Sequence, residues 1–149
     1  MKISFRGDYA LKAILDLALH YEKGLVRIQE VAKRQDIPLK YLEQILLALK
    51  GAGYVKSQRG AKGGYYLAKE PKEITLGEII RLMEGPVSPI TCVSKSCYHR
   101  CGEETRCVFR PIWDKVRIIT EEVVDQISFA DMCEKCEEQN KSKFLMYQI

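Results

Sequence analysis

Four cysteines lie close together in the middle of the sequence, in the segment CVSKSCYHRCGEETRC. Cys92, Cys97, Cys101 and Cys107 fall within sixteen residues, and no cysteine precedes them. Thiolate sulfur binds zinc and iron–sulfur clusters, and it also reacts with oxidants. The chain has 149 residues, of which 46% are apolar, so it can form a hydrophobic core without disulfides or a structural metal. The cysteines are therefore available for chemistry.

The spacing of these cysteines, C-x4-C-x3-C-x5-C, bears on which metal they bind. Structural zinc sites usually take their ligands in close pairs from two separated knuckles, and no such pair of knuckles is evident here. Iron–sulfur clusters accept thiolates from irregular loops, and a loop rich in Ser, Gly and charge supplies hydrogen-bond donors and solvent access. The spacing favours an iron–sulfur cluster, with zinc, reactive thiols and an ordinary surface loop as alternatives. The separate pair Cys133 and Cys136 has no βαβ context, which favours two uncoordinated thiols.

The remaining composition predicts a cytoplasmic, non-enzymatic protein. The apolar stretch YALKAILDLALHY contains Lys12 and Asp16 and lacks a cleavage site, and no run reaches the length of a membrane span. Cytoplasmic thiols stay reduced, so disulfides are disfavoured. Residues 1–84 carry fifteen Lys and Arg against ten Asp and Glu, which suits a polyanionic partner and equally a solvated surface. Two histidines and scattered carboxylates do not assemble a nucleophile, a base and an orienting group, so we expect no enzyme.

The periodicity of apolar residues predicts a mainly α protein. Helical spacing is expected over residues 4–22, 27–36 and 38 to about 51. The stretch YVKSQRGAKGGYYLA, residues 54–68, is typical of a β-hairpin with a Gly-rich tip. Helix, short helix, turn, helix and hairpin in this order form a winged helix-turn-helix.

Further helices are predicted after the hairpin. A capping box from Thr75 to Glu78 opens a helix that ends at Gly85. The helix from Pro111 to Ser128 carries an apolar stripe so broad that it needs a partner. The motif SFAD could then cap a last short helix, and the chain ends in the apolar segment FLMYQI.

The outer side of the third helix is a candidate for reading DNA. Pro38 is expected in its first turn, and four leucines are expected to face inward, Leu39, Leu42, Leu46 and Leu49. The residues left facing outward near its start are Lys40, Tyr41, Glu43 and Gln44. In a helix-turn-helix such residues enter the major groove, where Lys and Gln donate to purine edges and Glu accepts from cytosine. A solvated helix face explains the same residues equally well.

The hairpin strengthens this interpretation. Arg59 at a Gly-flanked tip, with Lys56 and Lys62 nearby, can place a guanidinium in the minor groove while the glycines let the backbone approach phosphates. An ordinary tight turn is the alternative. A basic hairpin directly after a recognition helix indicates DNA binding more strongly than either feature alone.

These motifs together resemble the IscR/CymR/NsrR family of Rrf-type winged helix-turn-helix transcription regulators. The similarity runs from Met1 to about Ser128 and includes RGDYALKAILDLAL, YLEQILLALKGAGYV, RGAKGGYYLAKEP and ITLGEIIRLMEGP in order, followed by cysteines and a long helix. The resemblance implies a homodimer paired through the long helix and bound to a double-stranded DNA operator. The DNA-reading positions that it implies are Tyr41, Glu43, Gln44 and Arg59.

The resemblance also implies an iron–sulfur cluster in the loop, of the 2Fe–2S type or alternatively the 4Fe–4S type. Cys92 occupies the family's first cysteine position, and Cys101 and Cys107 keep its C-x5-C spacing. Two departures leave the fourth ligand open. Cys97 is an additional cysteine, and the histidine that completes the site in IscR-like members is replaced by Arg110, which cannot ligate iron.

In NsrR-like members an aspartate near the N-terminus of the partner subunit reaches the cluster, and Asp8 stands at that position here. We therefore expect Asp8 as the fourth ligand, ahead of Cys97 and further ahead of His99. An ordinary first-turn residue favoured by the helix dipole is the alternative role for Asp8.

The sequence accordingly predicts a cluster-sensing transcription regulator with no membrane partner. Its expected parts are a DNA-binding domain, residues 1–84, a cluster-binding loop, residues 85–110, and a dimerisation helix with a C-terminal tail, residues 111–149. One alternative is a CymR-like regulator controlled by thiol oxidation or by a partner protein docked on FLMYQI. Another is an electron carrier or a zinc-stabilised interaction module that reuses the fold.

Overall fold

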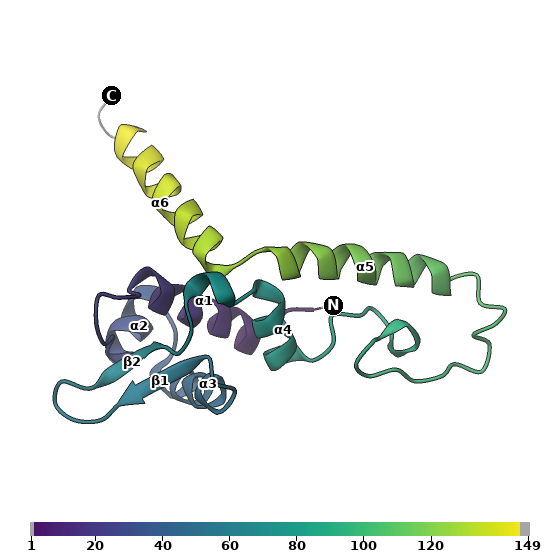
Figure 1. The fold of residues 1–149 in the computed structure, drawn as a ribbon, viewed down its shortest axis with the longest axis horizontal. Helices are drawn as coiled ribbons and strands as arrows, with labels where there is room; N and C mark the ends of the chain where they lie inside the picture. Colours follow the sequence, from purple (N-terminus) through teal and green to yellow (C-terminus); the bar gives the residue numbers. More distant parts are fainter. Residues whose placement is uncertain (1, 147–149) are drawn as a thin grey trace.

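The computed structural model describes residues 2–146, with side chains described through residue 141. Within these residues, six helices and two strands follow one another in the order α1, α2, α3, β1, β2, α4, α5 and α6. Figure 1 shows a body made of α1 to α4 and the hairpin, with α5 and the loop before it extending to one side and α6 projecting away. The chain is mainly α, as the sequence predicts.

Helix α1, Phe5–Leu19, is the centre of the body. The Ser4 hydroxyl caps its start by accepting a hydrogen bond from the Gly7 amide at 3.2 Å. Its small and branched apolar residues repeat at helical spacing and are buried against α2, α3, α4 and α6. The helix ends three residues before the predicted Glu22, because the chain turns there through left-handed Glu22 (φ 65°) and Gly24 (φ 109°).

Helices α2, Ile28–Gln35, and α3, Leu39–Gly51, form the helix-turn-helix pair. Buried Ile37 lies in the turn between them. Pro38 is the N-cap of α3, with an extended ψ of 129°, and is not in its first turn as predicted. The predicted inward position of Leu39 is wrong, because the first turn extends beyond the core and leaves Leu39 39% exposed. The residues of α3 that are buried are Leu42, Ile45, Leu46 and Leu49.

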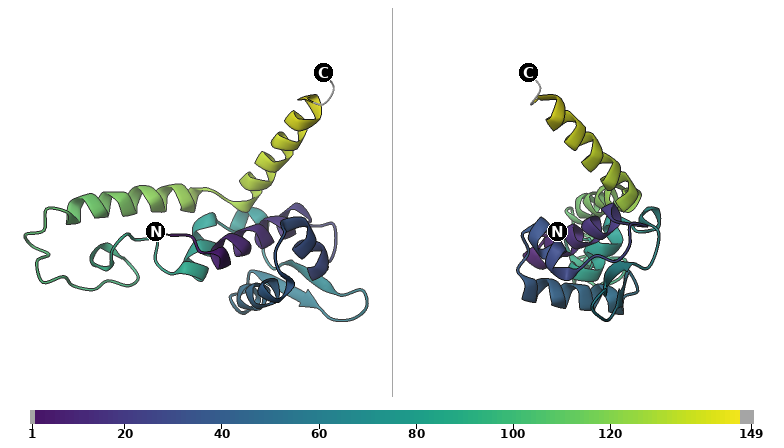
Figure 2. Two further views of the ribbon diagram at one scale, coloured as in Figure 1. Left: turned by 180° about the vertical axis from the view of Figure 1, so that it is seen from behind. Right: turned by 90° about the vertical axis from the view of Figure 1, so that its left-hand side faces the viewer.

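The predicted hairpin consists of β1, Val55–Gln58, and β2, Gly64–Leu67, which pair antiparallel with Val55 opposite Leu67. Val26, in the connection between α1 and α2, adds a bridge to its outer edge. The Val26 amide donates to the Tyr65 carbonyl at 2.9 Å, and the Tyr65 amide donates to the Val26 carbonyl at 2.8 Å. Strand β2 is therefore paired on both sides, with β1 and with Val26, while the tip of the hairpin extends from the body (Figure 2).

Helix α4, Leu76–Glu84, closes the body and contacts α5, Arg110–Gln126. The predicted capping box is present, with Thr75 and Glu78 exchanging hydrogen bonds of 2.9 and 3.3 Å. Arg81 donates both guanidinium branches to Asp125 of α5, at 2.6 and 2.8 Å. Gly77 permits this approach, because a Cβ there would collide with the Asp125 carboxylate.

Helix α6, Phe129–Met146, is longer than the short helix predicted. Its start is capped as expected, because Ser128 and Asp131 exchange backbone-to-side-chain hydrogen bonds of 2.8 and 3.2 Å. Phe129 fills the main core beside α1, and the rest of the helix leads outward (Figure 2). The FLMYQI segment lies outside the residues whose side chains are described. Among the described residues, no helix has both the length and the apolar character needed to cross a membrane.

Candidate DNA-binding face and cysteine loop

The outer face of α3 carries the polar residues that the sequence singles out. Burial of Leu42, Ile45 and Leu46 fixes the rotation of the helix and turns the opposite side to solvent. The exposed residues on that side are Lys40, Tyr41, Glu43 and Gln44. Leu47 is also exposed there, and the sequence offered no reason to single it out.

An aromatic contact joins the start of α3 to α1. The rings of Tyr41 and Tyr9 meet edge to face with centroids 6.4 Å apart, and the Tyr9 ring lies 6.2 Å from that of Phe5. Lys12 lies 5.9 Å from the centroid of the Tyr9 ring. The orientation of Tyr41 is therefore tied to the first turns of α1.

The tip of the hairpin exposes Arg59 and Lys62. Gly60 has a φ of 116°, and a Cβ on Gly63 would collide with the Gln58 carbonyl oxygen, so the tight tip requires glycine at both positions. Lys50 at the end of α3 donates to the Ser57 hydroxyl of β1 at 2.7 Å. In the views of Figures 1 and 2, α3 and the hairpin lie on the same side of the molecule, away from α6. The exposed side of α3 and the tip of the hairpin thus belong to the same part of the molecule.

An ion pair between buried Asp16 of α1 and the partly exposed Arg34 of α2, not predicted from the sequence, holds the two helices together. Asp16 is only 1% exposed and accepts two hydrogen bonds from the Arg34 guanidinium, at 2.9 and 2.8 Å, and one from the Gln35 amide at 3.1 Å. The hydrogen bond to Asp16 raises the pKa of Arg34. Asp16 interrupts the apolar pattern of α1, and this interruption is the signal that could have revealed the pair. The contact holds the two helices that precede α3 in one arrangement.

The cysteine loop connects α4 to α5 and contains one short 3-10 turn, Thr91–Val93. All four of its thiols are free, with Cys92 and Cys107 half-buried and Cys97 and Cys101 exposed. Among the described residues, no three His, Cys, Asp or Glu side chains lie close enough together to hold a metal ion. The loop therefore supplies thiol ligands that are not gathered into one site.

Two polar clusters hold the loop. Lys95 pairs with Glu121 of α5 at 2.8 Å, and the same carboxylate oxygen accepts from buried Arg117 at 2.7 Å. The Glu104 carboxylate of the loop accepts a hydrogen bond from the Tyr98 hydroxyl at 2.6 Å, and it forms an ion pair with Arg110 at the start of α5, at 2.9 Å. The first of these bonds raises the pKa of Tyr98. Through Glu121, the position of the loop is linked to that of α5.

The other candidate ligands do not gather with these thiols into a site of three or more ligands among the described residues. Asp8 is in the first turn of α1, where its carboxylate is 46% exposed and pairs with Lys12 at 2.7 Å. This hydrogen bond raises the pKa of Lys12. His99 is exposed in the loop, and Arg110, at the position of the IscR-like histidine, pairs with Glu104. Within one chain, the structure does not bring Asp8 to the cysteines, and the expected contact is one between subunits.

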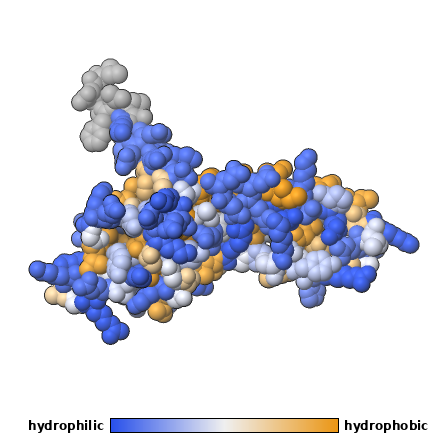
Figure 3. Space-filling model, in the orientation of Figure 1, coloured by the Kyte–Doolittle hydropathy of each residue, from blue (hydrophilic) through white to orange (hydrophobic). Residues whose placement is uncertain are grey.

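The outer face of α5 is apolar and uncovered. Its exposed stripe consists of Ile112, Val116, Ile119 and Val123. Figure 3 shows hydrophobic surface over this helix beside hydrophilic side chains. Such a stripe at helical spacing is typical of a helix that packs against another.

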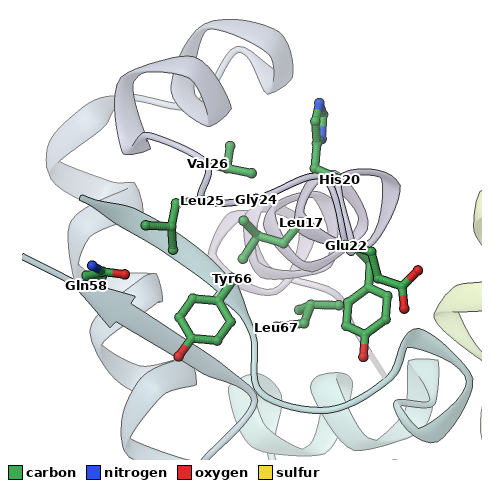
Figure 4. A pocket seen from close by; sticks show the side chains of 10 residues that line it. Leu17, His20, Glu22, Gly24, Leu25, Val26, Gln58, Tyr66 and Leu67 are labelled. Atoms are coloured by element: carbon green, nitrogen blue, oxygen red, sulfur yellow. The ribbon is translucent and has the colours of Figure 1, made fainter. Parts of the chain in front are cut away.

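A hollow of about 300 Å³ opens between the end of α1 and the base of the hairpin (Figure 4). The buried side chains of Leu17, Val26 and Leu67 line it, and Tyr66 and Gln58 contribute exposed groups. The Nδ1 atom of His20 lies 2.7 Å from the Asp16 carbonyl oxygen. The lining includes no serine, cysteine or lysine, so this hollow offers no nucleophile of those types for catalysis.

Comparison with known proteins identifies the family. The sequence model of the Rrf2 family, described as an iron-dependent transcriptional regulator, matches residues 3–135. This chain belongs to the Rrf2 family. Among its relatives in the family, the HTH-type transcriptional regulator CymR of Bacillus subtilis (strain 168) is 37% identical over 132 residues, which cover 89% of each protein.

Solved structures of Rrf2 proteins share the fold. The structure of CymR (YrzC), the global cysteine regulator of B. subtilis, has a TM-score of 0.79 and 36% identity, covering 91% of this chain and 98% of that one. T. potens IscR has a TM-score of 0.75 and 40% identity, covering 93% and 90%. The predicted winged helix-turn-helix fold is confirmed.

Membership of the Rrf2 family makes this protein a transcription regulator, which implies DNA binding. The relatives are named as regulators, so the prediction that the protein is not an enzyme is also confirmed. CymR and IscR are both among its relatives. Family membership alone therefore does not distinguish a CymR-like from an IscR-like signal.

Proposed function

We propose that this Rrf2 protein is a homodimeric regulator whose affinity for its operator responds to an iron–sulfur cluster held by the cysteine loop. The ligands in this proposal are Cys92, Cys101 and Cys107 from one subunit and Asp8 of the partner subunit, with Cys97 as the alternative fourth ligand. The observation that carries the proposal is the set of four free thiols in one loop that is linked to α5.

The donor set fits such a cluster. Thiolates are its usual ligands, and irregular loops usually supply them. Each of the four thiols is at least partly accessible, and none is used in a disulfide. Because the thiols are not gathered, ligation requires the loop to fold inward. When bound, the cluster supplies a centre that oxygen, nitric oxide or iron limitation can alter.

Inward folding of the loop would act on α5 through charged contacts. Lys95 and Arg117 both donate to one carboxylate oxygen of Glu121. A shift of the segment around Lys95 would therefore alter the ion pairs of Glu121, which lies in the second half of α5. Asp125, one turn further along, holds Arg81 of α4. The loop is thus linked through α5 to the DNA-binding body. A ten- to hundred-fold change in operator affinity requires only about 1.4 to 2.7 kcal/mol.

Asp8 is available to a partner subunit at low cost. Its carboxylate is about half exposed, and its pair with Lys12 is a surface ion pair worth roughly 0 to 1 kcal/mol. An oxygen ligand is displaced from iron more readily than a thiolate, which suits a sensor. Because Asp8 and Tyr9 are adjacent and the Tyr9 ring contacts Tyr41, ligation by Asp8 would bear on the start of the recognition helix.

The dimer and its operator contacts complete the proposal. The uncovered stripe on α5 supports pairing with the same helix of a second subunit, which would bury the four branched side chains named above. Each subunit would then read one half-site, with α3 in the major groove through Lys40, Tyr41, Glu43 and Gln44. Arg59 and Lys62 of the hairpin would contact the minor groove and the phosphates.

A second candidate function is that of a thiol-controlled regulator. The exposure of Cys97 and Cys101 supports it, because accessible thiols are open to oxidation. The relationship to CymR supports it too, because the CymR of Staphylococcus aureus has been solved in an oxidized form. In this case the thiols would act without a metal, and a partner protein could be the effector.

The colour of the protein separates the two candidates. Protein purified without oxygen, or reconstituted with iron and sulfide, should absorb visible light, and dithionite should bleach that absorbance. Iron and sulfide should be present in amounts that match one cluster per loop. A colourless protein after reconstitution, with operator affinity that changes on oxidation by peroxide, would replace the cluster with the thiol mechanism.

A further inference from the structure

Leu47 is an apolar residue in the middle of the polar face of α3. Its side chain is 71% exposed, although the other leucines in the second half of the helix are buried. Lys40, Glu43, Gln44 and Lys50 surround it on the same face, and all are exposed. A single exposed leucine is ordinary on a protein surface, and Leu47 is distinguished by its position among polar residues of α3.

The geometry of the helix places Leu47 among the proposed base-reading residues. With 3.6 residues per turn, Leu47 lies only about 20° around the helix axis from Lys40, between Glu43 on one side and Gln44 on the other. It lies about 10 Å further along the axis than Lys40, which corresponds to roughly three base-pair steps. The hydrogen bond from Lys50 to Ser57 of β1 marks where this face meets the hairpin. On this face, Leu47 therefore lies just before Lys50, the residue that contacts the hairpin.

Chemistry limits what an exposed leucine can read in the major groove. Its side chain neither donates nor accepts hydrogen bonds, and the only apolar group that a base presents in that groove is the C5-methyl group of thymine. Contact between the two removes both apolar surfaces from water. The cations at both ends of the face, Lys40 and Lys50, favour a polyanion over an apolar protein as the occupant of this surface.

We propose that Leu47 is a specificity-determining residue that contacts the methyl group of a thymine in each operator half-site, next to the base pairs read by Glu43 and Gln44. The proposal rests on the DNA-reading role of α3 described above. It adds a preference for thymine over uracil that the polar residues cannot produce, because uracil and thymine present identical hydrogen-bonding groups in the major groove.

The test removes the methyl group from the DNA and the leucine from the protein, separately and together. The full-length protein first selects its operator from a library of random duplex DNA. Each thymine of the selected operator is then replaced by deoxyuridine, one position at a time, and Kd is measured by fluorescence anisotropy. For the wild-type protein, uracil at one position per half-site should weaken binding about four-fold, the value of one buried methyl group.

The same substitution should have no effect on Leu47→Ala, because the contact is already lost. Leu82→Ala removes a leucine that is exposed on α4, away from α3, and should keep the wild-type response to uracil. Equal melting temperatures of the three proteins exclude unfolding as a cause. An operator at which uracil affects wild type and Leu47→Ala equally, or affects neither, would overturn the role of Leu47 alone. A library from which no sequence is enriched would overturn the DNA-reading face, and this inference with it.

Discussion

The body of this protein and its arm, which consists of the cysteine loop and α5, bury their apolar residues to very different extents. In the body, formed by α1 to α4 and the hairpin, apolar residues such as Ile14, Leu46 and Ile79 have no exposed surface. On α5, the four residues of the apolar stripe keep between 41 and 56% of their surface exposed. The body therefore has a complete core, whereas the apolar stripe of α5 is left exposed to solvent.

This difference in burial suggests two separate tasks, DNA recognition by the body and control of DNA binding by the arm. The buried residues of α3 fix the rotation of this helix in the body, and the ion pair of Asp16 with Arg34 holds α2 against α1. In the proposed function, the thiols of the loop and the stripe on α5 would be fully packed only with a bound cluster and a second subunit. We expect changes in the body to alter which DNA is bound, and changes in the arm to alter when it is bound.

The largest expected effect is the loss of the cluster when a ligand is removed. Cys101→Ala should give a colourless protein after reconstitution, because only water can replace a thiolate lost from an exposed cluster. Cys97→Ala is the matched control, since Cys97 is equally exposed and is not among the three preferred thiols. Visible absorbance and iron content measure both. A coloured Cys101→Ala protein beside a colourless Cys97→Ala protein would mean that the ligand set is wrong.

The next effect concerns the stripe on α5. Ile119→Asp places a carboxylate in the proposed dimer interface, which should weaken dimerisation by about 100-fold or more. Ile118→Asp makes the same change on an exposed isoleucine about 100° away around the helix, and it should leave the dimer intact. Sedimentation at micromolar protein reports the oligomeric state. If both variants sediment like wild type, the stripe is not the interface.

A smaller effect is expected in the body. Arg59→Ala should weaken binding to every operator by about 1 to 3 kcal/mol, because a contact in the minor groove is lost. Glu43→Ala should instead relax the discrimination among related operators. Binding curves against a panel of operators with single base changes separate the two outcomes. An equal loss across the whole panel for Glu43→Ala would remove this residue from base reading.

The smallest expected effect tests the link between the two regions. Asp8→Ala should shift the visible spectrum and shorten the lifetime of the bound cluster in air, because the proposed oxygen ligand is lost. Dimerisation and the melting temperature should stay unchanged, since only an exposed ion pair with Lys12 is removed. Lys12→Ala breaks the same pair but keeps the carboxylate, so its spectrum should match wild type. An Asp8→Ala protein with a wild-type spectrum and lifetime would assign the fourth ligand to Cys97 or His99.

The sequence was sufficient for the body because burial there repeats with the helix. The spacing of apolar residues located α1 to α4, and the glycines located the hairpin. The sequence did not predict the exposure of Leu39, because this residue lies at the edge of the core. It also did not predict the ion pair of Asp16 with Arg34, because these residues are far apart in the chain. The length of α6 was underestimated because this helix has few apolar residues to mark its course.

The candidate site could be predicted only in its residue types. Four cysteines in an irregular loop indicate metal or redox chemistry, but no periodicity fixes the conformation of such a loop. The contacts that do hold it, Lys95 with Glu121 and Glu104 with Tyr98, join residues that are not distinguished by spacing. The choice among four thiols and a carboxylate therefore depends on experiment.

The most direct test of the account compares one preparation in two states. Operator affinity should be measured by anisotropy, without oxygen, for the reconstituted dimer and for the same protein after a chelator has removed the iron. The account predicts that Kd differs at least ten-fold between the two states and that adding iron and sulfide restores the first value. Cys101→Ala should show a single Kd under both treatments. Equal affinity in the two states of the wild-type protein, with the cluster demonstrably bound in one of them, would contradict the claim that the cluster controls DNA binding.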